Sequence, residues 1–251
     1  MIRLEDVHKS FGAKVVLAGL SLEVPTGMNT VIMGGSGSGK SVTLKLIVGL
    51  LEPDSGRIEV DGKNVPELDR DELAELRGQI GYVFQFAALF DSMTVAENIR
   101  LGLVKRGLDD AAIRGRIEES LATVELSGQE DRYPAELSGG MRKRVGIARA
   151  VALRPRYILY DEPTTGLDPI TSAVMDRLMQ RTRDLGVTGV VVTHDMRTAF
   201  TVGDRVAMLY EGVIRQTGTV PEIQATTDPV VRQFIEGRPD EVEPPLRRSV
   251  S

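Results

Sequence analysis

The segment GGSGSGKS, at residues 34–41, constrains this chain more than any other feature. It matches the pattern G-x-x-x-x-G-K-[ST] at every fixed position, and it lies between an apolar run typical of a strand (MNTVIM) and a run with helical spacing (VTLKLIVGLL). In that context, glycines let backbone N–H groups converge on phosphate oxygens without Cβ clashes. We expect Lys40 to bind the β- and γ-phosphates and the Ser41 hydroxyl to ligate Mg²⁺. The predicted nucleotide-binding loop comprises Gly34, Gly35, Ser36, Gly37, Ser38, Gly39, Lys40, Ser41 and Val42.

Two acidic residues end a later apolar run, YILYDEP. In a chain that carries a phosphate-binding loop, an aspartate at the end of such a strand holds the Mg²⁺ shell, which assigns that role to Asp161. The adjacent Glu162 is placed to orient or deprotonate the attacking water. The same pattern also fits a strand that simply ends at two solvated acids.

Gln85 and His194 each follow an apolar run, IGYVFQ and VVVTHD respectively. In open α/β sheets the carboxyl ends of the strands face the ligand, so both side chains are expected there. His194 could hydrogen-bond the γ-phosphate, and Gln85 could ligate Mg²⁺ or position water. Structural roles at strand ends are the alternative for both. The second histidine, His8, ends a polar strand and is interpreted as a surface residue.

A second candidate phosphate grip lies at AELSGGMRKR, residues 135–144. Ser138, Gly139 and Gly140 precede a basic, helix-prone run, so bare N–H groups and the positive end of a helix dipole would point at an anion. Met141, which follows, is a poor hydrogen-bonding partner.

Composition narrows the partners. The net charge is −5 and the pI is near 5.3, which argues against binding to nucleic acid through phosphate neutralisation. The absence of cysteine excludes disulfides and thiolate metal sites. No apolar run approaches the roughly 18 residues needed to span a bilayer, and the N-terminus lacks the apolar core of a signal peptide. Any membrane role is therefore expected to come through a partner.

Hydrophobic periodicity predicts an α/β fold. Short alternating strands and an Asp61–Gly62 hairpin turn fill the first third, which indicates an N-terminal antiparallel β region. Helical periodicity then dominates, with one apolar face formed by Ile113, Ile117, Leu121 and Val124. Buried strands separated by a helix from about 169 to 185 return after it, and a hairpin around Glu211–Gly212 closes the pattern. We expect a mostly parallel sheet core with an inserted α-helical subdomain at about 86–154.

Together these motifs resemble those of the ATP-binding cassette (ABC) family, over almost the whole chain. The resemblance implies a P-loop NTPase with the ABC ATPase fold, hydrolysis of ATP with Mg²⁺, and a homodimer in which each signature completes the partner's ATP site. It assigns adenine stacking to Phe11, the Walker A loop to 34–41, the Q-loop to Gln85, the signature LSGGM to 137–141, Walker B to YILYDE, the D-loop Asp168 to GLD, and the switch histidine to His194. Lys40, Gln85, Glu162 and His194 are the predicted catalytic residues, and Ser41, Gln85 and Asp161 the predicted Mg²⁺ ligands. The signature usually ends in Gln, and here Met141 replaces it.

Several segments also resemble the ATPase of the Mla system and related MCE-type lipid transporters: FQFAALFDSMTVAENI, the Met-ending signature, TTGLDPITSAVMDRL and DPVVRQFIEG. This narrower resemblance implies a homodimer beneath two copies of a membrane permease, at the cytoplasmic face of the inner membrane of a bacterial envelope. A small STAS-domain protein and an MCE-domain protein are the further partners that it implies. The transported molecule would be phospholipid or another hydrophobic molecule.

Other functions remain open. An ATPase of an amino-acid or other small-solute importer shares much of this skeleton. A non-transport ABC ATPase or an ATP-binding regulator is disfavoured by the single cassette, the acidic balance and the presence of both Glu162 and His194. Phe86, Leu89 and Phe90 would form a groove for a permease helix, or else pack in the core. We predict one ATP-binding domain at 1–237, with a short helix at DPVVRQFIEG that places Val231, Phe234 and Ile235 on one side. A flexible tail is expected at 238–251. The resemblance to the Mla-type ATPase implies the alternative, an extension that reaches the partner ATPase.

Overall fold

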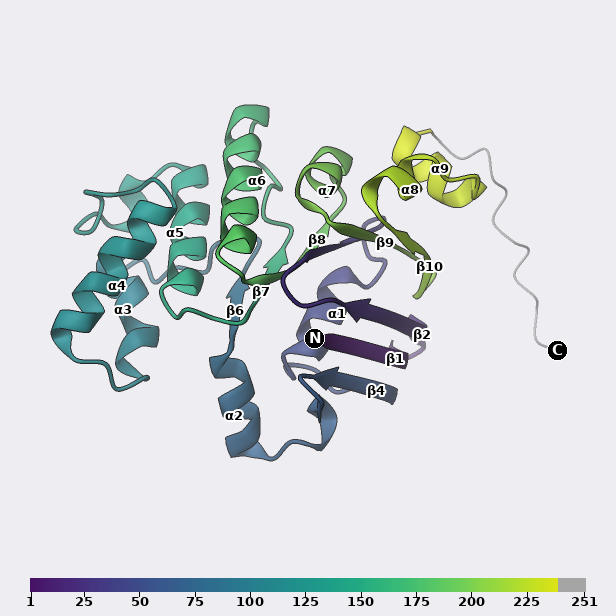
Figure 1. Cartoon of the computed structure of the whole chain (residues 1–251), viewed down its shortest axis with the longest axis horizontal. Coiled ribbons are helices and arrows are strands. Elements are labelled where there is room, and N and C mark those ends of the chain that lie inside the picture. Colours follow the sequence, from purple (N-terminus) through teal and green to yellow (C-terminus); the bar gives the residue numbers. More distant parts are fainter. Residues whose placement is uncertain (239–251) are drawn as a thin grey trace.

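The N-terminal part of the chain forms a small antiparallel sheet. The computed structural model describes residues 1–238 (Figure 1). The strand order in this sheet is β2-β1-β4-β5, and the Asp61–Gly62 turn joins the last two strands, as predicted. The bounds are β1 Ile2–Phe11, β2 Lys14–Val24, β4 Ser55–Val60 and β5 Lys63–Asn64.

A six-stranded sheet forms the centre of the molecule, in the order β10-β9-β3-β8-β7-β6. All neighbours pair in parallel except β9 and β10, which form the predicted antiparallel hairpin. Every residue of β3, β7 and β8 is buried, because helices or the smaller sheet cover both faces. The bounds are β3 Asn29–Met33, β6 Ile80–Val83, β7 Tyr157–Asp161, β8 Thr188–Thr193, β9 Arg205–Tyr210 and β10 Val213–Gly218.

Two apolar cores lie on opposite faces of this sheet. Side chains alternate along each strand, so Ile32 packs with α1 and the antiparallel sheet, whereas Val31 packs with the helices on the other face. Helices α3, α4 and α5 gather at one end of the molecule, and α6 and α7 lie side by side (Figure 1). The bounds are α1 Lys40–Ile47, α2 Arg70–Gly78, α3 Val95–Val104, α4 Asp110–Thr123, α5 Gly139–Val151, α6 Pro169–Asp184, α7 Met196–Val202, α8 Val220–Gln224 and α9 Pro229–Glu236, with 3₁₀ turns at Val65–Glu67 and Pro134–Glu136.

The predicted fold class is confirmed: an N-terminal antiparallel region, a mostly parallel core and a group of helices inserted between β6 and β7. The predicted apolar face of α4 is buried. On α9, Val231 is buried, and Phe234 and Ile235 pack against the same core. Of the tail predicted at 238–251, only Arg238 belongs to the described residues, and residues 239–251 lie outside them.

Some local features differ from the prediction or were missed. The first helix ends at Ile47 rather than continuing through the apolar residues beyond it, because Gly49 adopts a positive φ of 65°. Helices α2, α7 and α8 were not predicted, although the capping box at Asp69 and Glu72 is a sequence signal for α2.

Within residues 1–238, no helix has both the length and the apolar character required to cross a bilayer.

Candidate functional site

The glycine-rich loop leads from β3 directly into α1. Gly39 caps this helix with φ 108°, a conformation that strongly favours glycine, and a Cβ there would lie 2.8 Å from Leu17 Cδ2. Lys40 is only 6% exposed, and its Nζ donates to the carbonyl oxygens of Gly34 at 2.8 Å and Gly35 at 3.0 Å. The side chain is therefore folded back under the loop whose N–H groups would bind phosphate.

Two hydroxyl groups contact the Asp161 carboxylate at the end of β7. The Ser41 hydroxyl donates to Asp161 Oδ1 at 2.7 Å, and the Tyr82 hydroxyl donates to Asp161 Oδ2 at 3.0 Å. Burial and the adjacent carboxylate raise the pKa of Tyr82, so this phenol stays protonated as a donor. Hydroxyl and carboxylate oxygens are the ligands that Mg²⁺ prefers, so the donor set fits the predicted ion. Tyr82 was missed by the sequence analysis.

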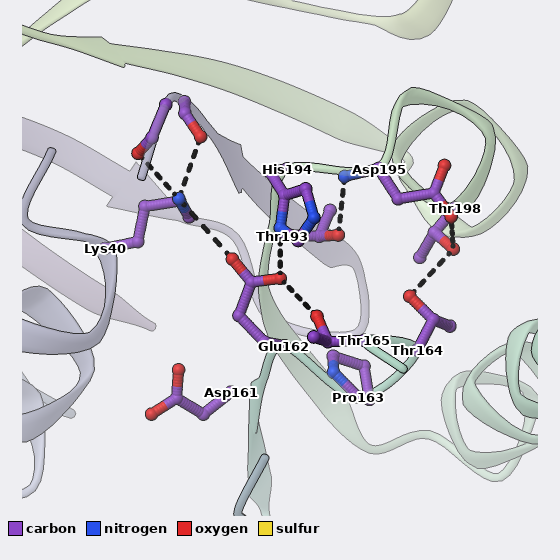
Figure 2. Close-up of polar contacts among 12 residues, drawn as sticks. Lys40, Asp161, Glu162, Pro163, Thr164, Thr165, Thr193, His194, Asp195 and Thr198 are labelled. Carbon is purple, nitrogen blue, oxygen red and sulfur yellow. Dashed lines mark hydrogen bonds and ion pairs between the residues drawn. The ribbon is translucent and has the colours of Figure 1, made fainter. Parts of the chain in front are cut away.

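Glu162 is the most connected acid of the site. It has a positive φ of 49°, which is uncommon for a residue with a side chain, and its backbone N–H donates to Val192 O at 3.0 Å. Its Oε2 lies 2.8 Å from His194 Nδ1 and accepts from Thr165 Oγ1 at 3.0 Å, and its Oε1 lies 3.4 Å from Lys40 Nζ (Figure 2). The local backbone turns this carboxylate toward the phosphate-binding loop.

An open cavity of about 540 Å³ joins most of the predicted residues. Phe11 lines it and is 47% exposed, which leaves a ring face available for stacking. Of the other predicted residues, the cavity is lined by Ser36, Gly37, Gly39, Lys40, Ser41, Val42, Gln85, Glu162 and His194. The predicted residues Gly34, Gly35, Ser38, Asp161 and Asp168 do not line it, although the first two and Asp161 contact side chains that do.

The signature residues do not line this cavity either. Ser138 caps α5, and its Oγ accepts from the backbone N–H of Met141 at 3.2 Å. The Met141 side chain is half-buried and packs against the larger apolar core. At the position where the signature usually has Gln, this chain therefore has an apolar packing contact in place of a side-chain amide. Gly140 lies against Thr171 on α6 so closely that a Cβ would clash with its methyl group. The signature therefore lies beside the D-loop helix, which Asp168 caps.

Comparison with known families decides the class of the chain. The family model described as "ABC transporter" matches residues 17–165, more than half of the sequence. The chain belongs to the ABC transporter family. This membership assigns ATP hydrolysis coupled to transport to the chain.

Three curated ABC relatives have different names. "Probable ribonucleotide transport ATP-binding protein mkl" of Mycobacterium tuberculosis is 40% identical, over 94% of this chain and 67% of its own length. "Protein TRIGALACTOSYLDIACYLGLYCEROL 3, chloroplastic" of Arabidopsis thaliana is 41% identical, over 96% and 74%. "Methionine import ATP-binding protein MetN" of Xylella fastidiosa is 42% identical, over 94% and 72%.

The ABC fold is also matched by a solved cassette. A dimeric ATP-binding cassette, solved in a post-hydrolysis state with ADP and Pi, is 35% identical and superposes with a TM-score of 0.80 over 88% of this chain and 99% of its own. That relative is a dimer. In a dimer, the signature of one chain could lie near the nucleotide cavity of the other, although the two are separate within one chain.

Lys143 is a buried residue beside the candidate site that the sequence analysis did not single out. It lies on α5, is 8% exposed, and its Nζ donates to Pro163 O at 3.0 Å and Thr165 O at 2.5 Å. Burial lowers the pKa of this ammonium, and the charge of Glu162 opposes that shift. Lys143 thus ties the signature helix to the loop that follows Glu162. Its position in a run of three basic residues, RKR, gave no signal that it was buried.

Proposed function

We propose that this chain is the homodimeric ATPase of a transporter that moves phospholipid or another hydrophobic molecule across a bacterial envelope. The lipid assignment rests on the resemblance to Mla- and MCE-type ATPases, and is supported by the 41% identity to a plant relative named after a glycolipid. The chain would bind two permease subunits, an MCE-domain protein and a STAS-domain protein. It would lie at the cytoplasmic face of the inner membrane.

Within one subunit, the chain's residues would bind and orient ATP. Phe11 stacks on adenine, the N–H groups of the loop at 34–41 bind the phosphates, and Lys40 neutralises charge on the β- and γ-phosphates. Ser41, Asp161 and Gln85 would hold Mg²⁺, which supplies charge neutralisation when bound. Glu162 takes the proton of the attacking water, and His194, 2.8 Å from it, hydrogen-bonds the γ-phosphate.

A second subunit would complete each site. Ser138 and Gly139 are exposed, and Gly139 is the first residue of α5. The positive end of the α5 helix dipole therefore favours an anion beside these two residues. Because the signature does not line the cavity of its own chain, we infer that its exposed residues, Ser138 and Gly139, face the ATP of the partner. Gly140 and Met141 would support them from behind, with Asp168 beside the signature. The dimeric state of the solved relative supports this arrangement.

The permease contact is assigned to the segment after Gln85. The side chains of Phe86 and Phe90 are 86% and 55% exposed, whereas Leu89 is half-buried against the core. Two exposed phenylalanines within five residues are costly in water and typical of a protein interface. Core packing is therefore excluded for Phe86 and Phe90, and partly retained for Leu89.

A small-solute importer is the second candidate, favoured by the 42% identity to a methionine importer. For a non-transport ABC ATPase, the net charge of −5 disfavours nucleic acid as the partner.

Purification of the membrane complex through this chain separates the candidates. We expect a permease and a lipid-loaded partner protein, identified by mass spectrometry of protein and of extracted lipid, to copurify with it. The variant carrying both Phe86→Ser and Phe90→Ser should lose the permease, whereas Val104→Ser, another exposed apolar position, should retain it. Copurification with a soluble amino-acid-binding protein, without lipid-loaded partner, would overturn the lipid assignment.

A further inference from the structure

A second cavity lies at the amino ends of the parallel strands, whereas the nucleotide site lies at their carboxyl ends. Its volume is about 410 Å³, within the range of small-molecule sites. Tyr157 and Thr188, the first residues of β7 and β8, line it, whereas Asp161 and His194 lie at the other ends of these strands. The cavity is therefore separate from the nucleotide site, and none of residues 1–238 lines both.

The inserted helices close the other side of this cavity. Ser120 and Thr123 from α4, with Val151 and Ala152 from the end of α5, face the strand residues across it. Helix α5 has 13 residues, so its signature end lies about 20 Å away. An occupant would therefore contact three elements, α5, β7 and β8, whose far ends carry the signature, Asp161 and the switch histidine.

The charge of the lining is positive. Among the residues that the structure describes, Arg116, Arg154 and Arg156 line the cavity together with one acid, Glu119. Arg154 pairs with Glu119 at 2.8 Å and Arg156 with Asp61 at 2.7 Å, while Arg116 donates one N–H to Ala152 O at 3.2 Å. A guanidinium has five N–H donors, so each arginine keeps donors beyond these contacts. The cavity can thus bind an anion without breaking the existing pairs.

The rest of the lining is mostly apolar. Leu185 is 63% exposed and Val151 and Val187 are half-buried, so these three present apolar surface, whereas Ala152 and Tyr157 are buried. Apolar walls with a few convergent polar groups bind ligands that have an apolar body and one fixed charge. A free inorganic anion would leave these walls uncovered, and a cation would be repelled by the arginines.

We propose that this cavity binds a small amphipathic organic anion, with a ring or short chain in the cavity and one carboxylate or phosphate on the arginines. Occupancy ties the end of the signature helix to the amino ends of β7 and β8. This chain supplies all the residues that are assigned to the site. The proposal therefore does not depend on which molecule the transporter moves.

Anilinonaphthalene sulfonate and phenylnaphthylamine are matched probes, because they share one apolar body and differ by the sulfonate. Fluorescence titration of the full chain, with saturating ADP in the nucleotide site, should show tighter binding of the sulfonate. Arg116→Gln and Arg156→Gln should each weaken sulfonate binding roughly tenfold, as expected for loss of a charge-assisted contact. Both variants should leave phenylnaphthylamine binding unchanged.

Val151→Phe should weaken both probes by filling the cavity, whereas Val104→Phe, at an exposed position on α3, should affect neither. Retained ADP binding checks that each variant folds. If the arginine variants bind the sulfonate as tightly as the wild type, the anion assignment is wrong. If Phe86→Ser instead removes the binding of both probes, they occupy that exposed patch and the proposal fails.

Discussion

Glu162 Oε2 lies 2.8 Å from His194 Nδ1, although the two residues are 32 positions apart and follow different strands. Strands β7 and β8 pair in parallel, with Asp161 opposite Val192, so the residues after each strand meet at one edge. The same carboxylate lies 3.4 Å from Lys40 at the start of α1. Three motifs from distant parts of the sequence therefore converge on one acid (Figure 2).

Glu162→Gln should preserve ATP binding and slow hydrolysis about 100-fold or more, because the amide keeps the shape but cannot take a proton. Single-turnover hydrolysis and equilibrium ATP binding measure the two effects separately. Glu52→Gln, at an exposed position, is the control and should behave as the wild type. Normal turnover by the Glu162 variant would exclude it as the general base.

Lys40→Ala should weaken ATP binding by roughly tenfold or more, because a charge-assisted contact to phosphate is lost. It also removes the hydrogen bonds that Lys40 makes to the loop carbonyls of Gly34 and Gly35. Titration with a fluorescent ATP analogue measures the affinity, and Lys45→Ala, exposed on the same helix, is the matched control. Wild-type affinity together with wild-type ATPase activity would refute the predicted role of the loop.

Lys143→Met should lower the ATPase kcat about tenfold while leaving the ATP affinity of the monomer unchanged. The substitution keeps the apolar stem but removes the contacts to Pro163 O and Thr165 O that tie the signature helix to the loop after Glu162. Steady-state kinetics and ATP titration separate kcat from binding, with the exposed Lys105→Met as control. A change in affinity with kcat unaltered would show that Lys143 does not act through the signature.

Asp176 should make stability depend on pH. Burial raises the pKa of this carboxyl above its ordinary value, as does the charge of Asp195, while the hydrogen bond from Thr198 and the charge of Arg197 oppose the rise. Its Oδ2 has no partner among the described residues. Because the folded state holds the proton more tightly than the unfolded state, the free energy of unfolding falls as pH rises from 3.8 through the folded pKa.

Asp176→Asn removes that titration, so its stability relative to the wild type should improve from pH 4 toward pH 8. Denaturant unfolding at a series of pH values measures the difference, and Asp91→Asn, at an exposed position, should show no such trend. A difference between Asp176→Asn and wild type that stays constant over this range would contradict the raised pKa.

The sequence predicted which strand-end residues come together, because Gln85, Glu162 and His194 each follow a strongly apolar strand. The parallel sheet then brings Gln85, Glu162 and His194 to one edge, where they line one cavity with Lys40 and Phe11. Tyr82 and Lys143 were missed because their contacts depend on packing: a strand residue reaches Asp161, and a lysine in a basic run is buried against two carbonyls. The placement of Met141 against the core likewise required the fold.

The separation of Ser138 from the nucleotide cavity is explained if each ATP is completed by a second chain. Mixing two inactive variants tests this most directly. Ser138→Arg should bind ATP but not hydrolyse it, and Lys40→Ala should fail at its own loop while keeping an intact signature. In their heterodimer, one site joins the intact loop of the first variant to the intact signature of the second.

Random mixing should therefore restore ATPase activity to about a quarter of wild type, since half the dimers would be mixed and one of their two sites intact. Wild-type turnover by Ser138→Arg alone, or no recovery on mixing, would contradict the composite site.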